Sequence, residues 1–202
     1  IPNRALAIGN LGHVLRAANK PLEALSQYET SLAIHTELGD VNTIATILGD
    51  VIHVHIELCD YDRARELLRQ QEGLSIADPV ARATYHVNKG RLLAHDKDLS
   101  GALQEYSNAL VVAEESGSRK SIASIHLHLR ELAQLNGNLA AYIEHNNEYT
   151  RITEEINGKE TAAKRAMQEA ERRISKERTE HEKQRAIFHS ALPRHIADRM
   201  AR

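Results

Sequence analysis

A repeated pattern with a period of about 40 residues limits this chain more than any other feature. A small residue within an apolar segment recurs at Ala24, Ala64 and Ala102, and Tyr142 stands at the fourth equivalent position. The intervals are 40, 38 and 40 residues. A fixed period of this length is typical of repeat proteins, in which each repeat is one supersecondary unit packed on its neighbours. Residues 1–150 are therefore expected to form about four stacked units.

Turn signals divide each unit into two helical segments. A turn stands just before each small-residue segment, and a second apolar segment lies about twelve residues upstream. The four turns are Asn19-Lys20-Pro21, Cys59-Asp60-Tyr61, Lys97-Asp98-Leu99 and Gly137-Asn138-Leu139. Gly39 and Gly117 are placed to end helices, and Asp78 with Pro79 is placed to begin one. The pattern predicts an all-α fold of helical hairpins.

The unit resembles the tetratricopeptide repeat (TPR), a helix–turn–helix in which small residues let the paired helices approach closely. The first and third copies carry Leu11-Gly12 and Lys89-Gly90 in the first helix. The second copy has Ile52 where the glycine is expected, and the fourth has Arg130 there. The resemblance implies a TPR-like helical-hairpin superhelix, and the heptad pattern beyond residue 150 predicts a long C-terminal coiled-coil helix after it. Because the period exceeds the usual ~34 residues, longer helices or longer linkers are expected.

In the TPR family the first helix of each pair lines a concave groove that binds peptides or proteins. The resemblance therefore places two polar positions per repeat in the groove, three residues apart and adjacent on one helix face. They are Asn10, His13, Asp50, His53, Asn88, Arg91, His128 and Glu131. Family members bind carboxylates through groove asparagines and basic residues, but Asp50 and Glu131 leave such a clamp incomplete. A protein or peptide ligand on this groove and a plain solvated concave face both stay open.

Charge is distributed unevenly along the chain. Residues 151–202 contain 13 Lys/Arg and 9 Asp/Glu, a net charge of +4, and the first 150 residues contain 13 and 19, a net charge of −6. The acidic residues of the basic segment are interleaved with its basic residues, which favours a solvated helix with ion pairs over a phosphate-binding stripe. No nucleic-acid partner is expected.

Sequence motifs for catalysis and metal binding are absent. The pairs His53/His55 and His126/His128 are spaced by two residues, whereas helical zinc sites use i, i+4 spacing, so a histidine-rich helix surface is expected. The lone Cys59 cannot form an intrachain disulfide and is expected to be inert. We expect no catalytic residue, no metal site and no cofactor in this chain.

Hydropathy and cysteine usage indicate a cytoplasmic location. No apolar run approaches the ~20 residues that a membrane-spanning helix needs, and no basic-then-apolar leader stands at Ile1. A single cysteine is compatible with a reducing compartment. No membrane contact is expected within these 202 residues.

From residue 151 a heptad pattern replaces the repeat, and residues 151–190 are predicted to form a dimerising signalling helix. The seam residues are Ala163, Met167, Ala170, Ile174, His181 and Phe188. Polar residues at Glu177 and Gln184 weaken the seam toward its C-terminal end. Gly158 is expected to be a flexible joint between repeats and coil. A single solvated helix and a parallel dimeric coiled coil with a switchable seam both stay open.

Residues 191–202 resemble the junction that leads into the catalytic domain of class III adenylate/guanylate cyclases. Leu192-Pro193 ends or kinks the preceding helix, and Ile196 and Arg199 follow at the spacing of that junction. The resemblance implies a sensory and dimerisation module whose catalytic domain, with Mg²⁺ or Mn²⁺, is absent from this chain. The alternatives are a free-standing TPR scaffold that binds peptides and a different effector after the same junction.

Overall fold

The computed structural model describes residues 2–191, and every regular element in that range is an α-helix. The helices are α1 (Pro2–Ala17), α2 (Pro21–Leu38), α3 (Val41–Glu57), α4 (Tyr61–Glu72), α5 (Pro79–His95), α6 (Leu99–Ser116), α7 (Arg119–Leu135) and α8 (Leu139–Ala191). The all-α prediction is confirmed. The chain divides into two compact units, Ile1–Thr153 and Glu154–Arg202, and α8 contributes to both.

The four hairpins of the first unit, α1–α2 to α7–α8, are closed by turns of one design. Each turn contains a residue with a left-handed backbone. These residues are Asn19, Cys59, Lys97 and Gly137, with φ of 58°, 60°, 67° and 67°. In the last three turns the next residue caps the second helix by accepting a hydrogen bond from the backbone N–H three residues later. The caps are Asp60, Asp98 and Asn138. The four predicted turns are confirmed.

Longer helices and one longer linker together account for the long repeat. Helices α1–α3 and α5–α7 contain 16 to 18 residues each. In contrast, α4 contains 12 residues and is followed by an extended connection over residues 73–78. There Asp78 caps α5 by accepting from the Ala81 N–H at 2.7 Å, with Pro79 in the first turn. Gly39 and Gly117 end α2 and α6 in the left-handed conformation, as predicted.

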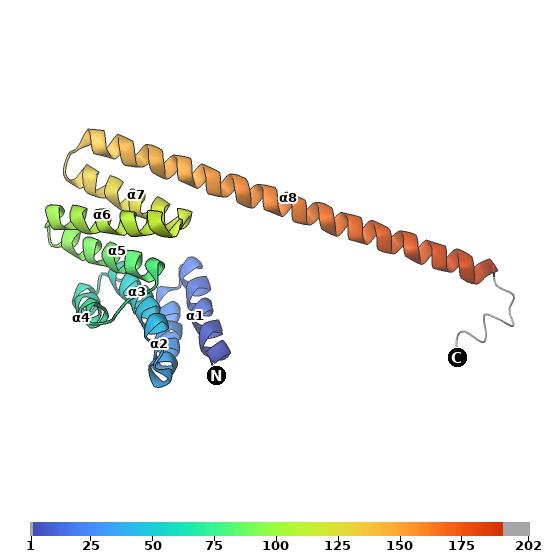
Figure 1. The fold of residues 1–202 in the computed structure, drawn as a ribbon, viewed down its shortest axis with the longest axis horizontal. Helices are drawn as coiled ribbons and strands as arrows, with labels where there is room; N and C mark the ends of the chain where they lie inside the picture. Colours follow the sequence, from blue (N-terminus) through green and yellow to red (C-terminus); the bar gives the residue numbers. More distant parts are fainter. Residues whose placement is uncertain (1, 192–202) are drawn as a thin grey trace. The chain divides into compact units, whose positions relative to one another are not determined.

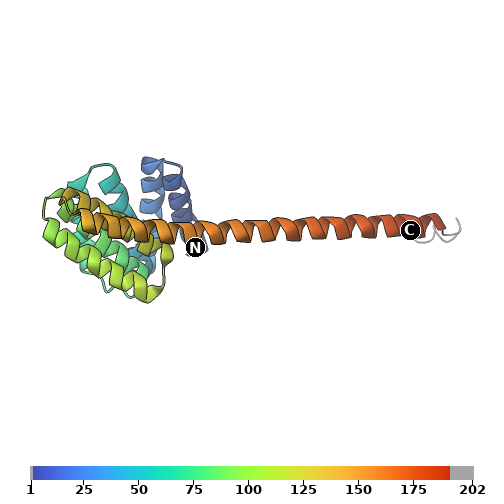
Figure 2. The same ribbon diagram turned by 90° about the horizontal axis from the view of Figure 1, so that it is seen from above.

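The hairpins stack in sequence order, so that α3, α5 and α7 form a continuous layer. Helix α3 packs on α2, α5 on α4 and α7 on α6, while α3 also contacts α5 and α5 contacts α7. Figure 1 shows α5, α6 and α7 side by side, and Figure 2 shows α1 and α2 as a neighbouring pair. The repeated alanines Ala24, Ala64 and Ala102 are fully buried, which allows the close helix approach that the sequence predicts.

Within the first and third hairpins, a tyrosine of the second helix packs on a glycine of the first. A methyl group at Gly12 would lie 2.6 Å from a ring carbon of Tyr28, and one at Gly90 would lie 2.6 Å from a ring carbon of Tyr106. Both rings are almost completely buried. Glycine is therefore required at these two positions because the ring occupies the space of a side chain.

The other two hairpins fill the same crossing with different pairs. In the second hairpin Ile52 is fully buried and Leu68 packs against the core cluster that contains it. In the fourth, the Arg130 Nη1 donates a hydrogen bond to the Asn146 Oδ1 at 3.2 Å. Ile52 and Arg130 replace the glycine of the other two hairpins, and in each case the facing helix has a different residue in place of the tyrosine.

The second unit contains the part of α8 that follows Thr153. The helix continues through Gly158 without interruption, and the flexible joint expected there stays a prediction. Side chains at residues 157–183 are all exposed. They include the seam residues Ala163, Met167, Ala170, Ile174 and His181. The Phe188 side chain and the junction residues Leu192, Pro193, Ile196 and Arg199 lie outside the described part of the chain.

No helix within residues 2–191 combines the length and the apolar character needed to span a bilayer.

Candidate functional site: a charged network on the inner layer

A chain of polar contacts links α1, α3 and α5. The Arg91 Nη1 of α5 lies 3.2 Å from the His53 Nδ1 of α3. On the other side of the ring, the His53 Nε2 lies 2.9 Å from the Glu57 Oε1, which is 3.6 Å from the Arg16 Nη1 of α1. A guanidinium can only donate, so the His53 Nδ1 accepts and the ring proton resides on Nε2, which donates to Glu57.

Burial keeps the His53 ring neutral. Loss of hydration, reinforced by the positive charges of Arg91 and Arg16, lowers the pKa of His53 to about 3. A neutral ring is also what the hydrogen-bond assignment requires, since one nitrogen accepts while the other donates. His53 therefore acts near neutral pH as a fixed polar connector between Arg91 and Glu57.

A second chain of contacts lies one repeat earlier. The Tyr28 hydroxyl is 2.9 Å from the His13 Nδ1, and the His13 Nε2 is 3.6 Å from the Asp50 Oδ2. Burial, together with the negative charge of Asp50, raises the pKa of Tyr28 to about 12, so the hydroxyl keeps its proton near neutral pH. Burial raises the pKa of Asp50, while His13 and Arg16 oppose this rise. These contacts tie α1 to α3.

Helix α7 adds His128 and Glu131 to the same surface. The His128 ring stacks on the Tyr106 ring with centroids 5.6 Å apart, and its Nδ1 lies 3.4 Å from the Glu131 Oε2. This hydrogen bond lowers the pKa of Glu131, and the positive charge of Arg91 acts in the same direction. The carboxylate of Glu131 thus partly balances the charge of Arg91 at the α5–α7 boundary.

Two cavities open on the layer formed by α1, α3, α5 and α7, which we call the inner layer. His53 lines one cavity and its partner Arg91 lines the other. Cavity A has a volume of about 250 Å³ and is lined by residues that include Arg16, Asp50, His53, Thr84, Val87 and Ser124. Cavity B has a volume of about 360 Å³ and is lined by residues that include Ile56, Tyr61, Arg91, Tyr106, His128 and Glu131. Both cavities take side chains from α3, α5 and α7.

Six of the eight predicted groove residues therefore lie in one charged surface, and two do not belong to it. Asn88 is fully buried, and its Nδ2 donates to the Gly49 carbonyl at 2.9 Å, which joins α5 to α3. Its assignment to the groove is corrected, because a ligand cannot reach it. Asn10 is exposed on α1, beside His13 and Asp50 at a separate cavity of about 70 Å³.

Sequence reasoning missed three residues of this surface. Arg16 and Glu57 are one helical turn beyond His13 and His53, so the i+3 and i+4 spacing of a helix face could have found them. Tyr61 comes from the second helix of a hairpin, where the family resemblance predicts no groove residue. Its ring stacks on His95 with centroids 3.7 Å apart and reaches cavity B from α4.

The prediction of a histidine-rich surface needs correction for three of the twelve histidines. His35, His55 and His126 are buried. The His55 Nδ1 lies 3.0 Å from the Asp60 Oδ2, and the His126 Nδ1 lies 3.2 Å from the His145 Nδ1. Among the residues that the structure describes, no group of three His, Cys, Asp or Glu side chains could hold a metal ion.

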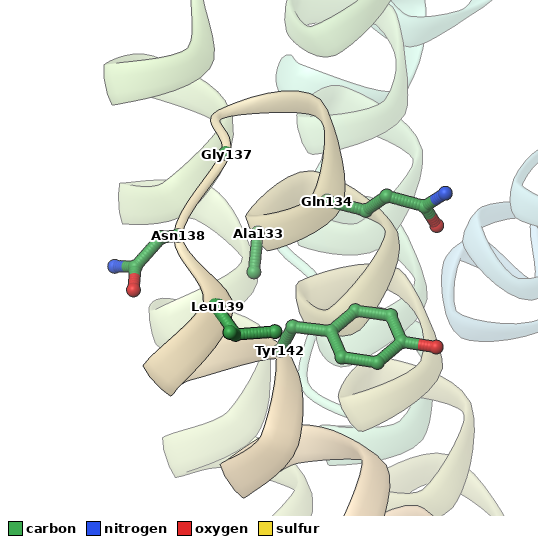
Figure 3. Close-up of a pocket in the computed structure, with 6 residues that line it drawn as sticks. All are labelled: Ala133, Gln134, Gly137, Asn138, Leu139 and Tyr142. Carbon is green, nitrogen blue, oxygen red and sulfur yellow. The ribbon is translucent and has the colours of Figure 1, made fainter.

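A further cavity, of about 270 Å³, lies at the turn between α7 and α8 (Figure 3). Tyr142 lines it at the position where the other repeats have a buried alanine. Its Asn138 points away from Gln134 in Figure 3 and is used to cap α8 at the Ala141 N–H. This cavity contains no charged side chain, so the charged inner layer is the better candidate for a binding site.

Replacing His53 with glutamine should flatten the dependence of stability on acid pH. Unfolding restores the ordinary His pKa of 6.5, whereas the folded value is about 3. Between these values the unfolded chain binds a proton that the folded chain does not, so stability is lost as pH falls from 6.5 toward 3. The loss attributable to His53 is about 1.4 kcal/mol per pH unit.

Glutamine can accept from Arg91 and donate to Glu57, yet it does not titrate. The free energy of unfolding should therefore be measured with urea at pH 7, 6, 5 and 4. At pH 7 the wild type should be at least as stable as His53→Gln, and at pH 4 it should be less stable. Parallel stability curves for the two proteins would contradict a His53 ring that stays neutral in the folded chain.

Comparison with known sequences finds no matching protein-family model and no matching curated protein. Solved structures do match. BtubC (BKLC) from P. vanneervenii has 18% identity and a TM-score of 0.56, with 78% of this chain and 66% of that protein covered. A Podosopora anserina protein described as a kinesin light chain with nearly identical TPR-like repeats has 14% identity and a TM-score of 0.55, with 81% and 92% covered. Nothing in these comparisons points to a nucleotide cyclase. Together with the four stacked hairpins, they show that the chain has an all-α, TPR-like repeat fold with a long C-terminal helix.

Proposed function

We propose that this chain is a protein-interaction scaffold that binds an extended peptide segment on the inner layer of α1, α3, α5 and α7. The observation that carries the proposal is the charged surface from Arg16 to Glu131, which lines two open cavities. A face kept only for solubility does not need a half-buried arginine held in place through a neutral histidine.

Arg91 supplies the main recognition group. Within residues 2–191 its guanidinium has a hydrogen-bond partner only in the His53 ring, and the side chain lines cavity B. The remaining N–H groups can donate to a ligand, and a guanidinium binds a carboxylate through two parallel hydrogen bonds. Tyr61 borders the same cavity and offers an apolar ring face. An acidic side chain next to a bulky apolar residue fits these groups.

The helix spacing favours an extended ligand. Packed helices lie ~8–10 Å apart and an extended chain advances ~3.3 Å per residue, so a peptide would meet a new inner helix about every three residues. A short acidic-apolar motif could therefore contact Arg91 in cavity B and continue toward Arg16 in cavity A.

Selection from a random peptide library against the full chain tests this proposal. We expect enriched peptides that combine an acidic residue with an aromatic or large aliphatic one, and that bind saturably at one site per chain. Binding measured by fluorescence anisotropy should weaken as salt increases, because the contact with Arg91 is ionic. Failure to enrich any peptide, or enrichment of peptides that bind a His53→Gln/Arg91→Ala double variant equally well, would contradict it.

We also propose that the second unit dimerises as a parallel coiled coil through the seam of Met167, Ile174 and their small neighbours. Met167 and Ile174 are 65% and 66% exposed in the single chain, which is unfavourable for large apolar side chains on a long helix. A parallel pair would bury them at successive a positions of the heptad.

Like charges at the positions that flank the seam should weaken the association of the two helices. In a parallel dimer Lys159 faces Lys164 of the second copy, and Arg173 faces Arg178 of the second copy, since g and e positions five residues apart meet across the seam. Arg173→Glu should replace two like-charge pairs by two attractive ones. Loss of the Arg173–Glu169 pair within the helix reduces the gain, so we expect a roughly 3- to 10-fold lower dimer Kd.

Arg172→Glu is the matched control for Arg173→Glu, because the charge change is identical while position 172 lies on the outer face of the coil. Sedimentation equilibrium should show stronger dimerisation for Arg173→Glu alone, and increased salt should strengthen the wild-type dimer. Equal effects of the two substitutions would contradict the parallel seam, as would a wild-type chain that is monomeric at tens of micromolar.

The link to a class III cyclase depends on Leu192, Pro193, Ile196 and Arg199, which lie outside the described residues. It stays a separate prediction, in which the present chain has no catalytic activity and a following domain binds Mg²⁺ or Mn²⁺. The coding sequence beyond Arg202 tests it directly: a cyclase domain there is the expected result, and a stop codon or an unrelated domain contradicts it.

A further inference from the structure

Helix α1 exposes an apolar stripe on the side opposite to its contact with α2. Ala7, Leu11 and Val14 follow one another at helical spacings of four and three residues, and all are exposed. Leu11 is 46% and Val14 63% exposed. A helix at the end of a stack normally turns polar residues toward solvent, as the capping repeats of solenoid proteins do. We call this surface the end face.

Both equivalent positions are buried in the second and fourth hairpins, and the second of them is buried in the third hairpin. Forty residues after Leu11 and Val14 stand Val51 and Val54, which are 2% and 0% exposed. In α7 the equivalent residues are Leu129 and Leu132, and in α5 the second position is Leu92. These three are 3%, 5% and 4% exposed. The end face therefore carries the side chains of an internal stacking surface.

The chain itself shows what covers such a surface. Val51 and Val54 belong to a core cluster in which Tyr28 of α2 takes part, with Leu25 and Leu32 of α2 packed against it. These three residues recur at i, i+3 and i+7, which is one face of a helix. The covering element in each hairpin is thus the second helix of the hairpin before it.

We propose that the end face docks a further helical hairpin of the same repeat type, whose second helix lies on α1 as α2 lies on α3. The occupant is a helix that presents bulky apolar side chains at i, i+3 and i+7. The end face exposes the kind of apolar side chains that α3 and α7 bury against the preceding hairpin. This interaction is independent of the peptide site on the inner layer and of the coiled coil.

The test uses the first hairpin of the chain as its own partner. Residues 1–40 are fused in front of Ile1 of the full chain, so that the 40-residue period is kept. Asp40 of the added hairpin then precedes Ile1, and the Asn3 N–H takes the position of the Thr43 N–H that Asp40 caps in the natural chain. We expect a cooperative unfolding transition at a higher urea midpoint than that of the unfused chain, because stacked repeats stabilise one another through neighbour contacts.

Placement of the same substitutions in either copy supplies the control. Leu11→Glu with Val14→Glu in the inner copy should abolish the gain, whereas the same pair in the outer copy should leave it unchanged. No gain from the fusion, or equal effects in both copies, would overturn the proposal. If these substitutions in the unfused chain convert a dimer to a monomer in sedimentation, a second copy occupies the end face instead, which also overturns it.

Discussion

Gly90→Ile should be among the most damaging single substitutions in this chain, and Tyr106→Leu should largely reverse its effect. A side chain at Gly90 would start 2.6 Å from the Tyr106 ring, which is 3% exposed and cannot move into solvent. Overpacking of this kind costs about 1–3 kcal/mol, and the β-branched side chain puts the cost near the upper end. Tyr106→Leu alone leaves a cavity and should cost about 2 kcal/mol.

The rescue follows from the second hairpin, which has Ile52 and Leu68 at these two positions in a packed core. The double variant reproduces that pair, so a double-mutant cycle from urea unfolding should give a favourable interaction energy of about 1–3 kcal/mol. Gly158→Ile is the matched control, because α8 offers open space there. Additive effects of the two substitutions would show that the crossing in the third hairpin is not interchangeable with that in the second.

Arg91→Ala should weaken the binding of library-selected peptides by about 10- to 100-fold. A hydrogen bond to a charged group contributes about 1.5–3 kcal/mol, and Arg91 is the half-buried cation that lines cavity B. Arg91→Lys keeps the charge but loses the planar donor pair, so it should recover only part of the affinity. Isothermal titration calorimetry on the folded variants measures both losses.

Arg63→Ala is the control for Arg91→Ala. Arg63 lies on α4 in an exposed pair with Glu66, so its removal changes the net charge equally without touching the inner layer. Its affinity should match the wild type within about twofold. Because Arg91→Ala also leaves the His53 Nδ1 without its donor, circular dichroism at the assay temperature must confirm that the variant is folded. Equal affinities of folded Arg91→Ala and Arg63→Ala would exclude Arg91 from recognition.

The sequence specified the helical hairpins well because their boundaries depend on local chemistry. Asp60, Asp98 and Asn138 cap helices through hydrogen bonds to nearby backbone N–H groups, and Gly39 and Gly117 end helices. Neither role depends on distant parts of the chain. The short α4 could not be predicted, because residues 73–78 carry no strong breaker apart from Gly73.

The groove was harder to predict because, of two adjacent positions on one helix face, one is buried and the other lines a cavity. Asn88 and Arg91 are three residues apart, yet Asn88 is buried against the Gly49 carbonyl and Arg91 reaches cavity B. The sequence contains no sign that Gly49 would bring α3 so close to α5. Similarly, the helix continues through Gly158, because one glycine costs only about 1 kcal/mol in an otherwise favourable helix.

The heptad seam illustrates a different limit. Met167 and Ile174 follow a coiled-coil period, but a period defines only the surface of one helix. Its partner and orientation depend on charges such as those of Lys159 and Arg173, which act between chains. The exposure of these side chains in a single chain therefore leaves the dimer to solution measurements.

We propose that ligands bind on the inner layer of α1, α3, α5 and α7 around Arg91. Hydrogen-exchange mass spectrometry of the full chain, with and without a saturating library-selected peptide, tests it most directly. We predict added protection in peptides from α3, α5 and α7 that contain His53, Arg91 and His128, with none in α2 or α6. Protection confined to α2, α4 and α6, or to the second unit, would contradict the account.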